Sequence, residues 1–226
     1  MDRMDLTAAY NDCARITRRE ARNFYFAFLS LPPLPRRSIY ALYAFCREAD
    51  DLVDADAGDS RQQRLASLRA RLRFAAEGRP TLSRDLALSD TMQRYGVDPC
   101  DLDAVLIGMQ MDLDASRIPD AETLDNYCYH VASAVGLATL PVLNRGVRPS
   151  ADLREAAIHL GKGMQLVNIL RDVAEDLVRD RIYLPDDLLQ RHGVDKAAWA
   201  CPQRSPALRA VTVSYTHLTL PTKRIV

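Results

Sequence analysis

Residues 165–183 read QLVNILRDVAEDLVRDRIY, and the spacing of polar residues within this stretch decides the fold class. Asn168, Asp172 and Asp176 are spaced by four, so an α-helix places them in one polar stripe along a single face. Leucine, isoleucine and valine between these positions cover another face. We therefore expect an amphipathic helix, and we expect it to run from Ala151 to Val178 as the longest helix of the chain.

The rest of the chain also has a helical character. Ala, Leu, Arg, Asp and Glu dominate, Gly and Pro fall mostly between apolar-periodic segments, and no stretch alternates in the way typical of a strand. The sequence therefore predicts an all-α fold. Further helices are expected over Leu6–Leu29, ending at the proline-rich turn Leu31–Pro35, then from about Arg36 into an acidic segment, and over Gln62–Glu77, Thr81–Tyr95, Asp101–Ser116 and the apolar stretch Thr123–Leu143.

Composition excludes several classes of function. A chain of 226 residues that is 48% hydrophobic can bury one sizeable core, so we expect one domain. Thirty basic residues balance thirty acidic ones, so no global charge favours nucleic acid or an anionic membrane. No stretch reaches the roughly 18 continuous apolar residues of a membrane span. Five cysteines without a Cys-x-x-Cys pair argue against a disulfide framework and a zinc site.

The last sixteen residues, 211–226, differ from the rest of the chain. Their sequence, VTVSYTHLTLPTKRIV, has almost no helical period, although the preceding SPALRA is typical of the start of another helix. We hypothesise that residues 1–210 form a helical domain that is incomplete at its C-terminus and that the tail is foreign to it. Resequencing the locus tests this hypothesis.

A second acidic segment, READDLVD, covers residues 47–54. On a helix Asp50 and Asp54 present both carboxylates on one face, with Arg47 beside them. The structural alternative is a solvated helix end. Acidic side chains near a helix C-terminus oppose the macrodipole, however, and the apolar residues between 39 and 46 lie on the same side as Asp50. We therefore expect these carboxylates to point inward, where they need a partner.

Two carboxylate-bearing helices suit the chemistry of a magnesium-bound diphosphate. Magnesium prefers oxygen ligands and is usually held by one or two carboxylates together with phosphate oxygens of the substrate. Arginine makes bidentate contacts with phosphate oxygens. Cations and arginines together neutralise the charge that develops as diphosphate leaves, which lowers the barrier to an allylic carbocation. We expect the two acidic helix faces to meet across one pocket.

Four segments resemble the squalene/phytoene synthase family in order, over roughly residues 15–210: FYFAFLSLPP, YALYAFCREADDLVD, YCYHVASAVG and QLVNILRDVAEDLVRDRIYLP. The resemblance implies an isoprenoid-synthase-like helical bundle with a central apolar cavity. It implies metal ligands at Asp50, Asp54, Asp172 and Asp176, catalytic roles for Tyr43, Arg47, Tyr129 and Arg171, and substrate binding by Arg22, Phe24, Phe28, Gln165, Asn168 and Arg181. Ala21 and Asn23 depart from the pattern, because serines are common there.

The reaction implied by this resemblance joins two farnesyl or geranylgeranyl diphosphates head to head. One substrate loses diphosphate, the double bond of the other attacks the cation, and a proton leaves to give a cyclopropyl intermediate. A second ionisation leads to phytoene, squalene or hydroxysqualene, and the sequence does not choose among them. The implied cofactor is Mg2+, with NADPH required only for squalene.

The implied partners are prenyl diphosphates and no nucleic acid. We expect a cytoplasmic monomer, and the sequence leaves open a peripheral contact with the inner membrane face.

Two alternatives remain at this point. A terpene cyclase or head-to-tail synthase also uses Asp-rich helices, although the second motif here, Asn-x-x-Arg-Asp-x-x-x-Asp, lacks the Asn/Ser/Glu metal triad of cyclases. A non-catalytic assembly or scaffold protein of the same fold is the other alternative. Such a protein would be expected to lose the metal carboxylates, which this chain retains.

Overall fold

The computed structural model describes residues 5–54, 60–114 and 116–194, together with residues 206–208, 210, 211 and 213. This part of the chain contains no β-strand, only an isolated bridge between Arg117 and Ile182, so the predicted all-α fold is confirmed. Its elements are α1 (Leu6–Glu20), α2 (Arg22–Phe28), α3 (Pro33–Asp54), α4 (Ser60–Ala76), α5 (Ser83–Tyr95), α6 (Pro99–Asp114), α7 (Ala121–Cys128), the π-helical turn η1 (Tyr129–Ser133), α8 (Ala134–Leu143), α9 (Ala151–Val178) and α10 (Asp186–Arg191).

The first predicted helix is in fact two helices. The prediction of one helix over Leu6–Leu29 is wrong, because Ala21 leaves the helical region with φ −141° and ψ 68° and separates α1 from α2. The predicted extent of the proline-rich turn is wrong as well. Pro33 opens α3, since the first residue of a helix needs no N–H for the hydrogen-bond ladder and the fixed φ of proline suits that position.

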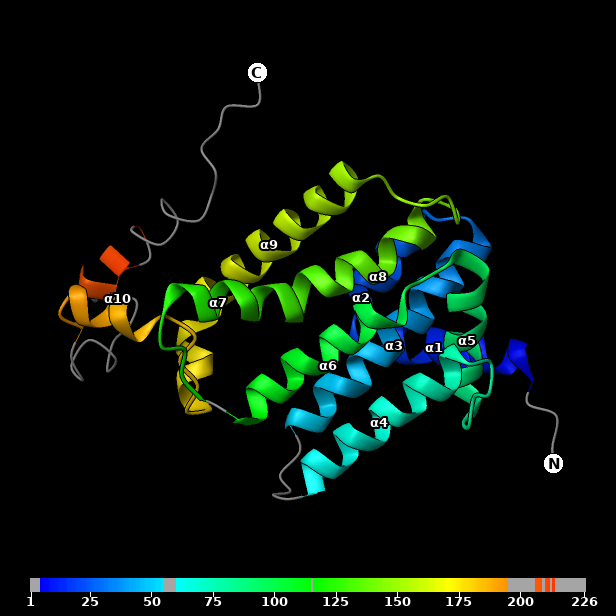
Figure 1. Ribbon diagram of the computed structural model, residues 1–226, viewed down its shortest axis with the longest axis horizontal. Coiled ribbons are helices and arrows are strands. Elements are labelled where there is room, and N and C mark those ends of the chain that lie inside the picture. The colour runs from blue at the N-terminus through cyan, green and yellow to red at the C-terminus, as the bar shows by residue number, and fades with distance from the viewer. Residues whose placement is uncertain are drawn as a thin grey trace.

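Helix α3 is the centre of the larger hydrophobic core. It packs against α1, α4, α5, α6 and α8, and Leu42 and Ala49 on its inner side are fully buried. In Figure 1, α4, α3 and α6 run side by side, and the rod formed by α7, η1 and α8 separates them from α9. The partly buried guanidinium of Arg71 ties α4 to two other helices, with 2.6 Å contacts to Glu48 of α3 and Asp85 of α5. The acidic segment 47–54 on α3 is therefore held by the main core.

The apolar stretch predicted over Thr123–Leu143 is a helical rod with a π turn at its centre. Glycines from two neighbouring helices let this turn, η1, approach closely. A Cβ atom at Gly161 of α9 would lie 2.5 Å from the Cα atom of Ser133, and one at Gly108 of α6 would lie 2.8 Å from a methyl group of Val131. The π turn is thus held between α6 and α9.

A smaller core lies between α9 and α10. Leu166 and Ile169 of α9 pack there with leucines of α10 and with Leu208 and Val211. Val211, the first residue of the tail hypothesised to be foreign, is completely buried. Residues 214–226 lie outside the described part of the chain, so the hypothesis about the tail stays a hypothesis. None of the described helices combines the length and the hydropathy that crossing a membrane requires.

Candidate active site

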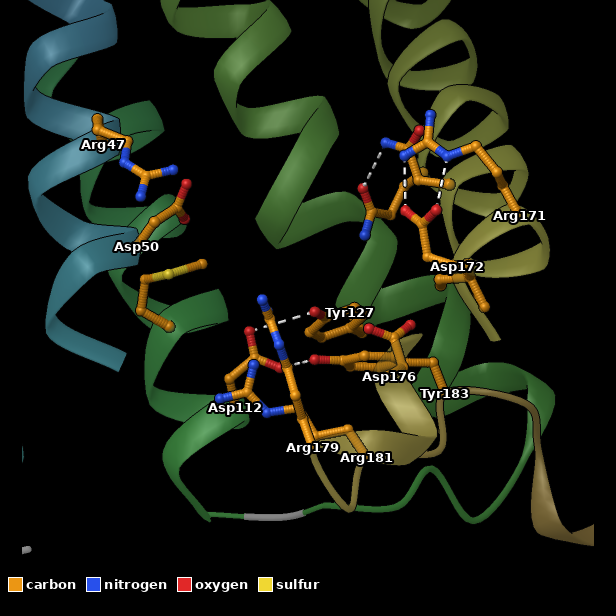
Figure 2. A pocket seen from close by; sticks show the side chains of 14 residues that line it. Arg47, Asp50, Asp112, Tyr127, Arg171, Asp172, Asp176, Arg179, Arg181 and Tyr183 are labelled. Carbon is orange, nitrogen blue, oxygen red and sulfur yellow. Dashed lines mark hydrogen bonds and ion pairs between the residues drawn. The ribbon is translucent and has the colours of Figure 1, made fainter. Parts of the chain in front are cut away.

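A cavity of about 490 Å³ opens between α3, α6, α7, α9 and the loop that follows α9 (Figure 2). Its lining is mainly polar, with Met109 and Ile169 as the aliphatic contributions. The residues around it are Arg47, Asp50, Met109, Asp112, Tyr127, Gln165, Asn168, Ile169, Arg171, Asp172, Asp176, Arg179, Arg181 and Tyr183.

Carboxylates from two helices face this one cavity. Asp50 reaches it from α3, and Asp172 and Asp176 reach it from α9 on the other side (Figure 2). The expectation that the carboxylate of Asp50 is buried is wrong, because its side chain is exposed, although it points into this cavity. The side chain of Asp54 lies outside the described residues. Asp50, Asp172 and Asp176 therefore share one water-accessible space, although Asp50 is more than a hundred residues away from the other two in sequence.

The two acids of α9 differ in their electrostatic environment. The guanidinium of Arg171 makes two 2.6 Å hydrogen bonds to Asp172, and this pairing lowers the pKa of that carboxyl. Burial raises the pKa of Asp176, and the negative charge of Asp172 raises it further, while Arg179 and Arg181 act in the opposite direction. Of these two acids, Asp176 is therefore the one whose charged form would be stabilised more by a nearby cation.

Arg47 extends from α3 into the same space. Its guanidinium pairs with Asp51 at 2.5 Å, one helical turn further along α3. Its Nε atom is buried and has no hydrogen-bond partner among the described residues. A guanidinium with an unused donor beside an open cavity is suited to an anionic ligand.

The donor atoms around the cavity fit a hard cation. Carboxylates and the side-chain amides of Gln165 and Asn168 supply oxygen, and neither histidine nor cysteine lines the space. Within the described residues, no three acidic, histidine or cysteine side chains come close enough to hold a metal ion by themselves. Oxygen donors of this kind suit magnesium, which is usually held by one or two carboxylates together with water and phosphate oxygens.

Five residues predicted for the site do not line this cavity. Tyr43 is partly buried on α3, one turn before Arg47, and Tyr129 begins η1 and packs against Ala104, Val105 and Ala134. The other three belong to α2, which has no buried residue. Arg22 is exposed, and Phe24 is 54% exposed and stacks on Phe28 with ring centroids 6.1 Å apart. Their roles stay predictions.

Sequence reasoning missed a carboxylate clamped by two tyrosines. Tyr127 donates to Asp112 Oδ2 at 3.2 Å and Tyr183 donates to Asp112 Oδ1 at 2.9 Å, and the two rings stack 5.1 Å apart. Asp112 lies in the last turn of α6, so the macrodipole argument used for Asp50 could have found it. Arg179 and Tyr183 directly follow the second motif, but the sequence assigned them no role. Nothing in the sequence marks Tyr127 as a site residue, since an aromatic residue at helical spacing usually belongs to the core.

These features define a class of protein. In an all-α bundle, carboxylates from two helices and several arginines surround one cavity, which is an arrangement able to hold a diphosphate and a hard cation together.

The family model described as squalene/phytoene synthase matches residues 17–220, and the chain belongs to the squalene/phytoene synthase family. The resemblance seen in the sequence is therefore confirmed.

Curated relatives support the same assignment. The chain is 40% identical over 195 residues to the chloroplastic phytoene synthase 1 of Arabidopsis thaliana, an alignment that covers 84% of this chain and 46% of the relative. It is 40% identical over 193 residues to the 15-cis-phytoene synthase of Synechocystis, covering 81% and 57%. The chain thus spans about half the length of the curated relatives it matches.

Solved structures share the fold. A dehydrosqualene synthase in complex with a ligand superposes with a TM-score of 0.84 at 34% identity, covering 95% of this chain and 74% of that structure. The squalene synthase HpnC from Alicyclobacillus acidocaldarius superposes with a TM-score of 0.85 at 25% identity, covering 96% and 82%. The predicted isoprenoid-synthase-like bundle is confirmed.

Proposed function

We propose that this chain is a prenyltransferase that condenses two prenyl diphosphates head to head. The observation that carries the proposal is the single cavity in which Asp50 of α3 faces Asp172 and Asp176 of α9. Membership of the squalene/phytoene synthase family supports the same reaction class. Terpene cyclisation and a scaffold role are not favoured.

We propose that the residues around the cavity have three roles: binding the metal, contacting the diphosphate oxygens and orienting the diphosphate. Asp50, Asp172 and Asp176 hold magnesium, with Asp54 as the fourth proposed ligand. When bound, this metal neutralises the charge of the departing diphosphate and so favours ionisation of the allylic substrate. A nearby cation favours the charged form of Asp176, whose pKa is raised by burial and by Asp172.

The chain's own donors act on the diphosphate oxygens. Arg47, Arg171 and Arg181 compensate its negative charge through charge-assisted hydrogen bonds, which are roughly twice as strong as neutral ones. Gln165 and Asn168, one turn apart on α9, orient the diphosphate next to Asp172. Five residues that do not line the cavity keep their proposed roles: Tyr43 and Arg22 in diphosphate contact, Tyr129 in diphosphate contact or proton transfer, and Phe24 and Phe28 in covering the prenyl chains.

Phytoene is the product that we propose, because the curated relatives at 38–41% identity carry the name phytoene synthase. Phytoene formation ends in proton loss, so Mg2+ is the required cofactor and NADPH is not. We also propose a cytoplasmic monomer that makes at most peripheral contact with the inner membrane face. Size-exclusion chromatography with light scattering and vesicle flotation test these two proposals.

The decisive experiment incubates the 226-residue chain with radiolabelled farnesyl and geranylgeranyl diphosphate, each with and without Mg2+ and NADPH. We expect release of diphosphate and a C40 hydrocarbon from geranylgeranyl diphosphate only when Mg2+ is present. A cyclic product from one substrate molecule would support a terpene cyclase. Release of no diphosphate under any condition, either from this chain or from a version of it completed to the length of its relatives, would support the scaffold alternative.

A further inference from the structure

The loop after α9 brings two arginines to the cavity through a tight turn. Asp180 adopts the left-handed conformation with φ 57°, and the N–H of Arg181 returns to the carbonyl of Asp176 at 2.9 Å. The turn places Arg179 and Arg181 at the cavity wall beside Asp112 and on the same side as Asp176 (Figure 2). A non-glycine residue in the left-handed region persists only where its surroundings hold it.

Part of that support comes from the connection between α6 and α7. The N–H of Ile182 donates to the carbonyl of Ser116 at 2.9 Å, and the N–H of Asp186 donates to the carbonyl of Ile118 at 2.9 Å. Arg117 also reaches Asp186, with 3.0 Å between Nε and Oδ1. None of the residues in these contacts lines the cavity.

Asp112 holds the same loop from the cavity side. Each of its oxygens accepts a tyrosine hydroxyl, one from Tyr183 in the loop and one from Tyr127 on α7. Tyr127 is only 4% exposed, and burial together with the charge of Asp112 raises the pKa of both tyrosines, so both hydroxyls remain donors. The stacked rings and the shared carboxylate form one unit, which we call the Asp112 clamp.

We propose that Asp112 is a positioning residue that, through Tyr183 and Tyr127, fixes the turn carrying Arg179 and Arg181 and thereby presents both guanidinium groups to the diphosphate before it binds. The inference rests on the proposed function, because it takes the anion in the cavity to be a diphosphate. Without the clamp, the two long side chains and their turn would have to be ordered when the ligand arrives, and that ordering weakens binding.

The first test measures the turn itself. Trypsin cleaves after arginine unless proline follows, so the cleavage rate after Arg179 and Arg181 reports how often the turn opens. Cleavage after the exposed Arg145 in the α8–α9 connection serves as the internal reference. Tyr183→Phe removes one hydrogen bond and keeps the ring stack. We expect it to raise relative cleavage of the turn about tenfold, the effect of losing one hydrogen bond to a charged group.

A graded series identifies the carboxylate as the cause. Asp112→Leu removes both acceptor oxygens, and Asp112→Asn keeps one, so we expect the asparagine variant to restore part of the protection lost in the leucine variant. Tyr10→Phe is the matched control, because Tyr10 donates to Asp90 at 2.6 Å in the same manner, but far from the cavity. That control should leave both cleavage of the turn and ligand affinity unchanged.

The second test measures binding of inorganic diphosphate with Mg2+ by titration calorimetry. We expect the dissociation constant to rise about tenfold in Tyr183→Phe and Asp112→Leu, and in turnover assays we expect KM to rise more than kcat falls. Unchanged cleavage in both variants would overturn the proposal. Faster cleavage with unchanged diphosphate affinity would overturn it too, since the turn would then not prepare the anion site.

The two proposals fail in different ways. If the wild-type chain binds inorganic diphosphate but releases none from prenyl substrates, the proposed function is wrong while the Asp112 clamp is still decided by cleavage and affinity. If turnover is normal and the clamp variants behave like wild type in both tests, the positioning role alone is wrong.

Discussion

The two helices that carry the acidic segments are supported in very different ways. Helix α3 is surrounded by α1, α4, α5, α6 and α8, whereas only Gly161, Leu166 and Ile169 of the 28-residue α9 are buried. The outer face of α9 leaves Leu160 65% exposed and Val167 62% exposed. Half of the candidate site is therefore fixed by the main core, while the other half depends on the packing of η1 and on the contacts of the loop after α9.

The largest expected effect concerns activity, for which the two helices should be equivalent. Asp50→Asn and Asp172→Asn each replace a proposed metal ligand without changing shape, so we expect turnover to fall about 100-fold or more in both. Release of radiolabelled diphosphate measures the rate, and circular dichroism checks the fold. Glu175→Gln is the control, because Glu175 is exposed on α9 and does not line the cavity. A variant of Asp50 or Asp172 with the wild-type rate would remove that residue from the site.

The free energy of unfolding should be far more sensitive to a substitution in α3 than to one on the outer face of α9. Leu42→Ala on α3 empties a fully buried position and should cost about 2–5 kcal/mol of unfolding free energy. Val167→Ala on the exposed face of α9 should change that free energy by less than about 0.5 kcal/mol. Urea denaturation of the two variants provides the comparison. Equal losses would mean that the outer face of α9 is covered in solution.

Two glycines on α9 sharpen the comparison within one helix. Gly161→Ala would place a methyl group 2.5 Å from the Ser133 backbone, so we expect a loss of about 1–3 kcal/mol as η1 is displaced. Gly163→Ala meets no atom within 4 Å and should stabilise the helix by up to about 1 kcal/mol. Thermal melts would show opposite shifts. A stabilising Gly161→Ala would contradict the close contact between α9 and η1.

The smallest expected effect is a pH dependence at the start of α7, which supports α9. The carboxylate of Asp120 accepts the backbone N–H of Thr123, and this bond lowers the pKa of Asp120. A lowered folded-state pKa stabilises the protein above the unfolded value of about 4, and the contribution is lost as the pH falls through the folded value. Wild type should therefore exceed Asp120→Ala in melting temperature at pH 7, and the difference should shrink towards pH 3.

The sequence predicted those parts of the fold that depend on local pattern. The bounds of α9, Ala151–Val178, followed from its helical period. The break at Ala21 could not be predicted, because alanine is the best helix former and no glycine or proline marks the end of α1 there. The π turn at Tyr129–Ser133 has no local signal either, and the glycines that make room for it belong to two other helices.

The candidate site shows the same division. A spacing of four residues was enough to place Asp172 and Asp176 on one face of α9, and both line the cavity. The exposure of Asp50 could not be predicted, because it depends on how open the cavity is between α3 and α9. The pairing of Asp112 with two tyrosines joins three separate segments, so it becomes visible only in the folded chain.

The π turn in the middle of the α7–α8 rod has a consequence for how this scaffold can change. Each residue advances an α-helix by about 100°, so the additional residue of a π turn rotates the helix before it by that angle relative to the helix after it. Deleting one residue within Tyr129–Ser133 would leave α8 seated in the core and turn α7 about its own axis, which would carry the Tyr127 hydroxyl away from α6. A single insertion or deletion in η1 would therefore rotate α7 about its own axis and change which of its side chains face the cavity.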